Sequence, residues 1–307
     1  MAGRKFKGIL AALIASLLWG GFYPVGRWMS MHGAAELDGL TVSLTRFAIA
    51  AVLLSPALFA AEPRKLLRRD WRRALVVFVP LALIGIVGEG TLVYISTRYT
   101  TAARSSLMAN TAPVFTLLFS RLFTGEKLTG RKLCGMSAGL AGIALVLAAR
   151  GGDVFSGGRT MIAGDLLAVG SGVCWALYTV LGVGPTERYG ALFSTELMFI
   201  LGTLMLLPAV LCSGGVRELA ALPPAGWIGI AYLGCMSSAL AFALWYVALK
   251  YLAPGELGAF GYLTPLLAAG ISGLAFAERF NALFLLALVL IPGGVALMVD
   301  PPKKRRA

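Results

Sequence analysis

Long apolar runs separated by short polar connections make up nearly the whole chain. Each run approaches the length of about 20 apolar residues that a helix needs to cross a bilayer. Continuous runs rich in Leu and Ala are unlike the roughly ten-residue alternating segments of a membrane barrel. The pattern therefore predicts an all-α integral membrane protein with ten transmembrane helices. The predicted spans are Ile9–Met29, Leu40–Ala60, Ala74–Arg98, Ala102–Phe123, Leu133–Ala149, Ile162–Gly184, Phe193–Cys212, Trp227–Lys250, Gly255–Phe276 and Asn281–Val299.

The composition agrees with this pattern. Of the 307 residues, 58% are hydrophobic and 13% are charged. A soluble domain has roughly 45–50% apolar and about 25% charged residues. The balance therefore excludes an ordinary soluble globular protein.

The formal net charge of +13 could indicate a nucleic-acid partner, but the distribution of the basic residues argues against one. When the ten spans are threaded through a membrane, most lysines and arginines fall on the side of the N-terminus. An excess of basic residues marks the cytoplasmic side of a membrane protein. We therefore expect both termini in the cytoplasm and the chain in the cytoplasmic (inner) membrane, with lipid around it and no nucleic-acid partner.

The chain also contains an internal repeat. With an offset of 152 residues, Leu92–Tyr99 lies on Leu244–Tyr251, and the register continues without a gap. The same offset pairs Pro113 with Pro265 and Glu126 with Glu278, and a looser offset of 156 residues pairs Trp19 with Trp175. The repeat predicts two halves, residues 1–150 and 151–307.

Each half contains five predicted spans. Because five is odd, the second half enters the membrane in the opposite sense to the first. Two inverted repeats of this kind are typical of secondary transporters, in which they allow alternating access. A duplicated structural bundle without transport is the other interpretation of the same repeat.

Three prolines mark predicted breaks within spans. Pro113 and Pro265 lie near the middle of spans four and nine, and Pro24 follows the glycine pair Gly20-Gly21 in span one. A proline inside a helix removes a backbone donor, and such breaks are tolerated where neighbouring groups or a water-lined cavity satisfy the backbone. Ordinary kinks are the alternative, but the equivalent positions of Pro113 and Pro265 favour a binding site near both.

Two charged residues lie inside predicted spans, where a charge is costly in lipid and usually functional. Arg46 lies in span two and could hold a carboxylate, or it could make a structural pair. Glu89 lies in span three and could bind an amine, carry a proton or sit at a cavity mouth. Other acids are expected at the interface: Glu196 near the end of span seven, Glu126 beside Lys127 and Glu278 beside Arg279.

Aromatic and amide side chains supply the remaining candidate chemistry. An aromatic ring with a polar handle suits a flat or amphipathic organic solute. The same side chains could instead pack helix against helix. The candidates are Trp19, Tyr23, Tyr94, Asn110, Trp175, Tyr178, Trp245, Tyr246 and Tyr262.

No enzyme motif appears in a useful context. There is no G-x-x-x-x-G-K-[ST] sequence for ATP, and the single histidine, His32, lies in a predicted loop. We therefore expect neither an enzyme nor a bound cofactor or metal ion.

On these residues the chain resembles the drug/metabolite transporter superfamily, in particular its ten-helix EamA branch. The resemblance covers essentially the whole chain. It is carried by Trp19-Gly20, by Arg46, by the small residues that lead to Pro113 with Glu126 closing the span, and by the echo at Pro265 and Glu278. The branch is similar to exporters of amino acids, other metabolites and drugs, and this implies a transporter.

Within that branch, Trp175 and the run from Trp245 through Pro254 to Pro265 resemble YddG-type aromatic amino-acid exporters. The resemblance implies that Trp175, Trp245 and Tyr262 face a central cavity. Where that subgroup tends to place Tyr and Trp before the proline of span four, this chain has Asn110-Thr-Ala.

We therefore predict a secondary transporter that exports small metabolites, foremost aromatic or apolar amino acids, by alternating access. Spans one, three, four, six, eight and nine are expected to line its cavity. The alternatives are a multidrug, nucleotide-sugar or other metabolite carrier of the same superfamily and, outside transport, an intramembrane enzyme or receptor-like protein. A monomer is the working expectation.

Overall fold

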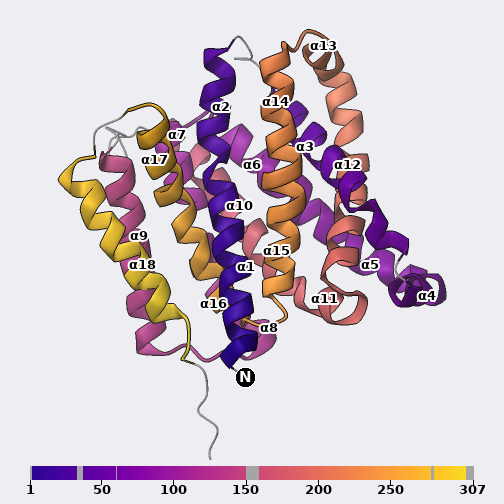
Figure 1. Cartoon of the computed structure of the whole chain (residues 1–307), viewed down its shortest axis with the longest axis horizontal. Coiled ribbons are helices and arrows are strands. Elements are labelled where there is room, and N and C mark those ends of the chain that lie inside the picture. The colour runs from indigo at the N-terminus through magenta and orange to yellow at the C-terminus, as the bar shows by residue number, and fades with distance from the viewer. Residues whose placement is uncertain (1, 33–36, 60, 150–158, 278–279, 302–307) are drawn as a thin grey trace, which may run out of the picture.

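The computed structural model describes residues 2–32, 37–59, 61–149, 159–277 and 280–301, and within these residues all regular structure is helical (Figure 1). The first half contains α1 (Ala2–Gly20), α2 (Phe22–Met31), α3 (Gly39–Leu54), η1 (Ser55–Phe59), α4 (Ala61–Arg69), α5 (Trp71–Ala82), η2 (Leu83–Gly88), α6 (Glu89–Ser96), α7 (Ala102–Ala109), α8 (Ala112–Thr124) and α9 (Gly130–Ala149). The second half contains α10 (Arg159–Leu181), α11 (Val183–Tyr189), α12 (Ala191–Ser213), α13 (Gly215–Ala220), α14 (Pro224–Tyr232), η3 (Leu233–Leu240), α15 (Ala241–Ala248), α16 (Pro254–Gly258), η4 (Ala259–Tyr262), α17 (Leu263–Ala275) and α18 (Ala282–Met298). The predicted all-α membrane fold is confirmed.

Eight helical segments of the described chain are long and apolar enough to cross a membrane, and each overlaps a predicted span. They are Gly3–Met31, Gly39–Phe59, Trp71–Ser96, Gly130–Ala149, Met161–Tyr189, Ala191–Ser213, Pro224–Ala248 and Pro254–Ala275. The apolar helix α18, at 17 residues, is shorter. The predicted fourth span is not one continuous helix, because α7 ends at Ala109 and α8 begins at Ala112.

Pro113 and Pro265, the two prolines paired by the repeat, lie in the first turns of their helices. Pro113 lies in the first turn of α8, directly after the break at Asn110 and Thr111. Pro265 lies in the first turn of α17, after the 3-10 segment η4. A proline is well tolerated in a first helical turn, because the missing N–H would have no intrahelical partner there. Both prolines therefore lie near breaks in the regular α-helix, and not at ordinary kinks, which were the alternative.

Two further segments depart from α-helical geometry. The segments η2 and η3 are π-helices, and each lies within a long membrane helix. Such segments are rare and frequently mark functional sites. With the 152-residue offset, η2 falls on residues 235–240, which lie within η3.

The same order of elements recurs in the two halves. The helix α6 covers residues 89–96, and α15 covers residues 241–248, an offset of 152. The broken pair α7 and α8 corresponds in the same way to α16, η4 and α17, and α9 corresponds to α18. Equivalent elements therefore follow the register that the sequence repeat predicts.

The helices α9 and α18 pack along their lengths and form one flank of the bundle (Figure 1). Their approach is close because both carry glycine at the crossing. A Cβ atom on Gly135 would lie 2.5 Å from the carbonyl oxygen of Gly294, and one on Gly294 would lie 2.6 Å from the carbonyl oxygen of Gly135. Small residues of this kind let membrane helices pack backbone to backbone.

The two ends of the chain lie at the same end of the bundle. Lys5 of α1 contacts Glu256 of α16, and the backbone N–H of Asp300, just after α18, donates to the same carboxylate. We call this the amino-terminal end. The last turn of α2 and helix α13 lie at the opposite end (Figure 1).

Candidate functional site

A cavity of about 620 Å³ lies in the centre of the bundle. Its volume falls within the roughly 300–1,000 Å³ range of small-molecule sites. Helices from both halves of the chain line it. The lining residues are Trp19, Phe22, Tyr23, Gly26, Met29, Ser30, Leu37, Gly39, Val42, Ser43, Arg46, Glu89, Gly90, Val93, Tyr94, Thr97, Ser105, Ser106, Ala109, Asn110, Ala112, Pro113, Ser171, Gly172, Trp175, Leu233, Phe242, Gly261, Thr264 and Pro265.

The cavity extends from the middle of the bundle to the opposite end. Its outer wall includes Ser30 in the last turn of α2, Gly39 at the start of α3 and Thr97 just after α6. No lining residue comes from α9, α16 or α18, which meet at the amino-terminal end. This conformation therefore opens the cavity away from the chain termini.

Arg46 and Glu89, a basic and an acidic residue, both line the cavity. Arg46 is buried, with 8% of the residue exposed, and its guanidinium carbon lies 4.1 Å from the centre of the Phe47 ring. Its Nε has no hydrogen-bond partner. Glu89 begins α6 directly after the π-helix η2. Among the described residues, no ion pair of up to 4 Å joins Arg46 or Glu89 to a protein partner.

The inner wall of the cavity is aromatic. The rings of Trp19 and Trp175 meet edge to face with centroids 5.2 Å apart, and both approach Phe242 edge to face, at 5.4 and 5.6 Å. The indole N–H of Trp19 donates to the carbonyl oxygen of Ser237 at 2.8 Å and fixes that ring. Ser237 belongs to the π-helix η3, which positions this part of the wall.

A second aromatic layer lies beneath this wall and does not line the cavity. Tyr178, Trp245, Tyr246 and Tyr262 are completely buried. The indole N–H of Trp245 donates to the hydroxyl of Thr179 at 3.2 Å, and the Tyr246 hydroxyl donates to the carbonyl oxygen of Tyr178 at 3.1 Å. These side chains close the cavity toward the amino-terminal end.

The breaks in both broken helices reach the cavity. Asn110 and Pro113 line it from the first half, and Gly261 and Pro265 line it from the second half. The Asn110 side-chain N–H donates to the carbonyl oxygen of Ser106 at 2.7 Å and so caps the end of α7. Pro24 is buried in α2 and does not line the cavity.

Tyr23 and Tyr94 complete the positions predicted from the sequence, and both line the outer part of the cavity. The Tyr94 hydroxyl accepts a hydrogen bond of 3.0 Å from the guanidinium of Arg98. Arg98 lies just beyond α6, and this hydrogen bond raises the pKa of its guanidinium. The Arg98 guanidinium therefore lies next to a tyrosine that lines the cavity.

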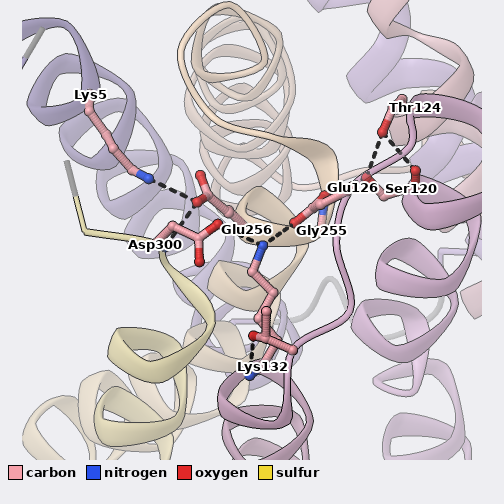
Figure 2. A network of polar contacts seen from close by, with 9 residues as sticks. Lys5, Ser120, Thr124, Glu126, Lys132, Gly255, Glu256 and Asp300 are labelled. Atoms are coloured by element: carbon pink, nitrogen blue, oxygen red, sulfur yellow. Dashed lines mark hydrogen bonds and ion pairs between the residues drawn. The ribbon is translucent and has the colours of Figure 1, made fainter. Parts of the chain in front are cut away.

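A network of ion pairs closes the amino-terminal end (Figure 2). Lys132 Nζ lies 2.7 Å from Glu126 Oε1 and 3.0 Å from Asp300 Oδ2, and Lys5 Nζ lies 2.8 Å from Glu256 Oε1. The backbone N–H of Gly255 donates to Glu126 Oε2 at 2.8 Å. The network therefore joins α1, α9, α16 and the segments that follow α8 and α18.

Three expectations about charges need correction or completion. Glu126 is not paired with Lys127 but with Lys132, because the turn at Gly125, with φ of 71°, directs the chain back toward Ser120. Glu196, expected at the interface, is completely buried within the protein, and neither of its carboxylate oxygens has a hydrogen-bond partner. Glu278 and Arg279 lie outside the described residues.

Lys132 and Glu256 were not among the predicted site residues. The available signal was their position at the first turn of an apolar span, where buried charges need partners. In the described part of the chain, no three His, Cys, Asp or Glu side chains come together as a metal site.

Comparison with known proteins adds the deciding observation. The model of the EamA-like transporter family matches residues 6–148 and again residues 162–300. The chain belongs to the EamA-like transporter family.

Several curated relatives have the same character. An uncharacterized transporter of Archaeoglobus fulgidus is 30% identical over 89% of this chain and 90% of its own. The uncharacterized inner membrane transporter YedA of Escherichia coli is 27% identical over 97% of this chain and 92% of its own. A probable terminal-alkyne amino-acid exporter of Streptantibioticus cattleyicolor is 26% identical over 84% of this chain and 82% of its own.

A crystal structure shares the fold with a TM-score of 0.76 over 94% of this chain and 95% of the other, at 24% sequence identity. Together with the helices described above, these matches make this EamA-like protein a multi-pass inner-membrane transporter of a small-molecule substrate. It is not an enzyme.

Proposed function

We propose that this transporter exports small amphipathic metabolites, foremost amino acids with aromatic or apolar side chains. One observation carries the proposal: a single central cavity holds one cation and one anion that are not paired with each other, above an aromatic wall. Charges inside a membrane bundle are costly and usually mark a substrate or ion pathway. A zwitterion with an apolar side chain satisfies all three features.

In this proposal, Arg46 receives the substrate carboxylate and Glu89 receives the ammonium group. An arginine fork suits a carboxylate because it offers paired donors. The unpaired Nε of Arg46 leaves one donor available. The aromatic wall of Trp19, Trp175 and Phe242 then contacts the side chain. Asn110 and the tyrosines Tyr23 and Tyr94 bind polar groups nearer the mouth.

We further propose that ten spans form two inverted repeats with both termini in the cytoplasm, and that they work by alternating access. The direction of equivalent helices supports inversion. Helix α8 runs from the cavity to the amino-terminal end, where Glu126 joins the network. Its equivalent α17 leads from the cavity to Phe276, whose ring packs under Arg27 of α2.

The repeat also assigns a role to the buried aromatic layer. Tyr94 lines the cavity, and its equivalent Tyr246 is buried; Asn110 lines the cavity, and its equivalent Tyr262 is buried. In a transporter with inverted repeats, the halves exchange conformations between the two states. Tyr246 and Tyr262, together with Trp245 and Tyr178, would then line the cavity when it opens to the cytoplasm.

The relative in Streptantibioticus cattleyicolor, a probable terminal-alkyne amino-acid exporter, supports an amino-acid substrate. The test is flux. Proteoliposomes loaded with a labelled aromatic amino acid should release it in a protein-dependent manner, and unlabelled apolar amino acids should compete. If no amino acid is transported while a drug or a nucleotide sugar is, the proposed amino-acid substrate is wrong. The protein is then a multidrug or nucleotide-sugar carrier of the same superfamily.

A further inference from the structure

The ion pairs at the amino-terminal end are unusually well buried for charges near a helix end. The side chains of Lys132, Glu126 and Glu256 are 1%, 6% and 5% exposed, respectively. Removing one partner of a buried ion pair leaves an uncompensated charge, which costs far more than losing a surface pair. The network therefore contributes to the conformation in which these five segments are together.

The network spans the contact that must open if the cavity is to reach this end. Helix α16 packs on α8 there (Figure 2). A Cβ atom on Gly258 would lie 2.9 Å from Cβ of Thr116, and one on Gly255 would lie 2.7 Å from Glu126 Oε2. Glu126 follows α8 and binds the backbone of α16 directly, while Lys5 and Lys132 neutralise the two carboxylates.

The repeat-equivalent contact at the opposite end is open. Ser106 of α7 is equivalent to Gly258 and lines the cavity, and Thr264 and Pro265 of α17 line it as well. The residue equivalent to Lys132 is Phe284, whose ring stacks on Phe280 at 4.6 Å. A lysine-centred network therefore has no counterpart at that position of the second half.

We propose that Lys132 is a positioning residue of a lock, which joins α16 to α8 and makes the conformation closed at the amino-terminal end the resting state of the empty transporter. The inference rests on the alternating access proposed above but not on any substrate. Because the lock joins α8 to α16 at the amino-terminal end, neutralising it shifts the population toward the conformation open at that end.

Cysteine accessibility tests this shift in the full-length protein, purified in detergent, with Cys134, Cys174, Cys212 and Cys235 replaced by serine. Thr116→Cys places a thiol in the closed contact, since Thr116 is completely buried. Ser106→Cys places one in the open cavity. Each is combined with Lys132→Met, and labelling by a maleimide is followed with time and without added substrate.

We expect Lys132→Met to raise the labelling rate of Thr116→Cys about tenfold, equivalent to about 1.4 kcal/mol, and to lower the labelling rate of Ser106→Cys. The neighbouring Arg131→Met is the matched control, because Arg131 is exposed and its guanidinium donates to the carbonyl oxygen of Ala296 rather than to the network. It should change neither rate.

Two results overturn the proposal: unchanged protection of Thr116→Cys, or faster labelling at both positions, which indicates loosening of the fold rather than a lock. If Lys132→Met does not yield folded protein, Lys5→Met is read in the same way, since it breaks the ion pair between α1 and α16. The two rates could change as expected, faster for Thr116→Cys and slower for Ser106→Cys, in a protein that transports no amino acid. That result would support the lock and contradict only the proposed substrate.

Discussion

The indole rings of Trp19 and Trp175, which the sequence repeat pairs at an offset of 156 residues, lie edge to face with centroids 5.2 Å apart in the cavity wall. Each ring belongs to a different half of the chain, in α1 and α10. Their contact places the junction of the two halves at the central cavity. An apolar solute that enters the cavity therefore meets both halves at once.

Replacing Trp175 by alanine should weaken transport of aromatic amino acids. Loss of an aromatic contact is worth about 1–2 kcal/mol, so we expect KM to rise about tenfold in proteoliposome flux. Trp227→Ala is the matched control, because Trp227 lies in α14 away from the cavity and is 46% exposed. If the two substitutions changed KM equally, the aromatic wall would not be part of the binding site.

Arg46 is expected to recognise the substrate carboxylate. Arg46→Met should raise the KM of an amino acid by about tenfold to a hundredfold, because a hydrogen bond to a charged group contributes about 1.5–3 kcal/mol. The KM of the corresponding amino-acid amide, which lacks the carboxylate, should change much less. A similar loss for both compounds indicates that Arg46 has a structural role, as in a pair with helix carbonyls.

Glu89 is expected to bind the ammonium group, and a proton-carrying role is the alternative. Glu89→Gln should raise the KM of an amino acid and leave the response of flux to an imposed pH gradient as it is in the unmodified protein. If the variant keeps its KM but loses the gradient response, Glu89 is the proton carrier and the amine has another partner.

The sequence was sufficient to predict most of the helices and the repeat, and five of its nine candidate aromatic and amide residues line the cavity. Arg46 and Glu89 were found because a charge inside a long apolar run has no other explanation than a partner or a pathway. Lys132 was not found, since its partners Glu126 and Asp300 come from segments whose approach depends on the fold. The burial of Tyr246 and Tyr262 beneath the cavity wall could not be predicted from the sequence either. Equivalent residues of two repeats occupy different environments in any one conformation.

Asp300 should contribute to stability in a pH-dependent manner. Burial alone raises the pKa of its carboxyl, but the hydrogen bond and charge of Lys132 outweigh burial and hold the pKa below its usual value of 3.8. The contribution is therefore fully present above pH 3.8 and is lost as the pH falls through the lowered pKa. Because Asp300 is half exposed, it should amount to less than about 1 kcal/mol.

The measurement is the difference in Tm between the unmodified protein and Asp300→Asn in detergent. It should be small and constant from pH 8 to pH 5. A difference that shrinks over this range would contradict the assignment of the pH dependence to Asp300.

Gly294→Ala should separate α9 from α18, because the added Cβ would lie 2.6 Å from the carbonyl oxygen of Gly135. We expect a lower Tm, with a loss of about 1–3 kcal/mol from overpacking. Gly293→Ala is the matched control in the same helix, since nothing lies within 4 Å of its added Cβ. Equal Tm values for the two variants would contradict the close packing of this pair.

The most direct test of the central claim compares three labelled compounds in proteoliposomes of the unmodified protein: phenylalanine, phenethylamine without the carboxylate, and 3-phenylpropionate without the amine. A cavity that offers Arg46, Glu89 and an aromatic wall together should transport the zwitterion at least about tenfold better than either analogue, as expected when one charged contact of about 1.5–3 kcal/mol is lost. Equal or faster transport of phenethylamine or 3-phenylpropionate would contradict recognition of both charges and, with it, the proposed amino-acid substrate.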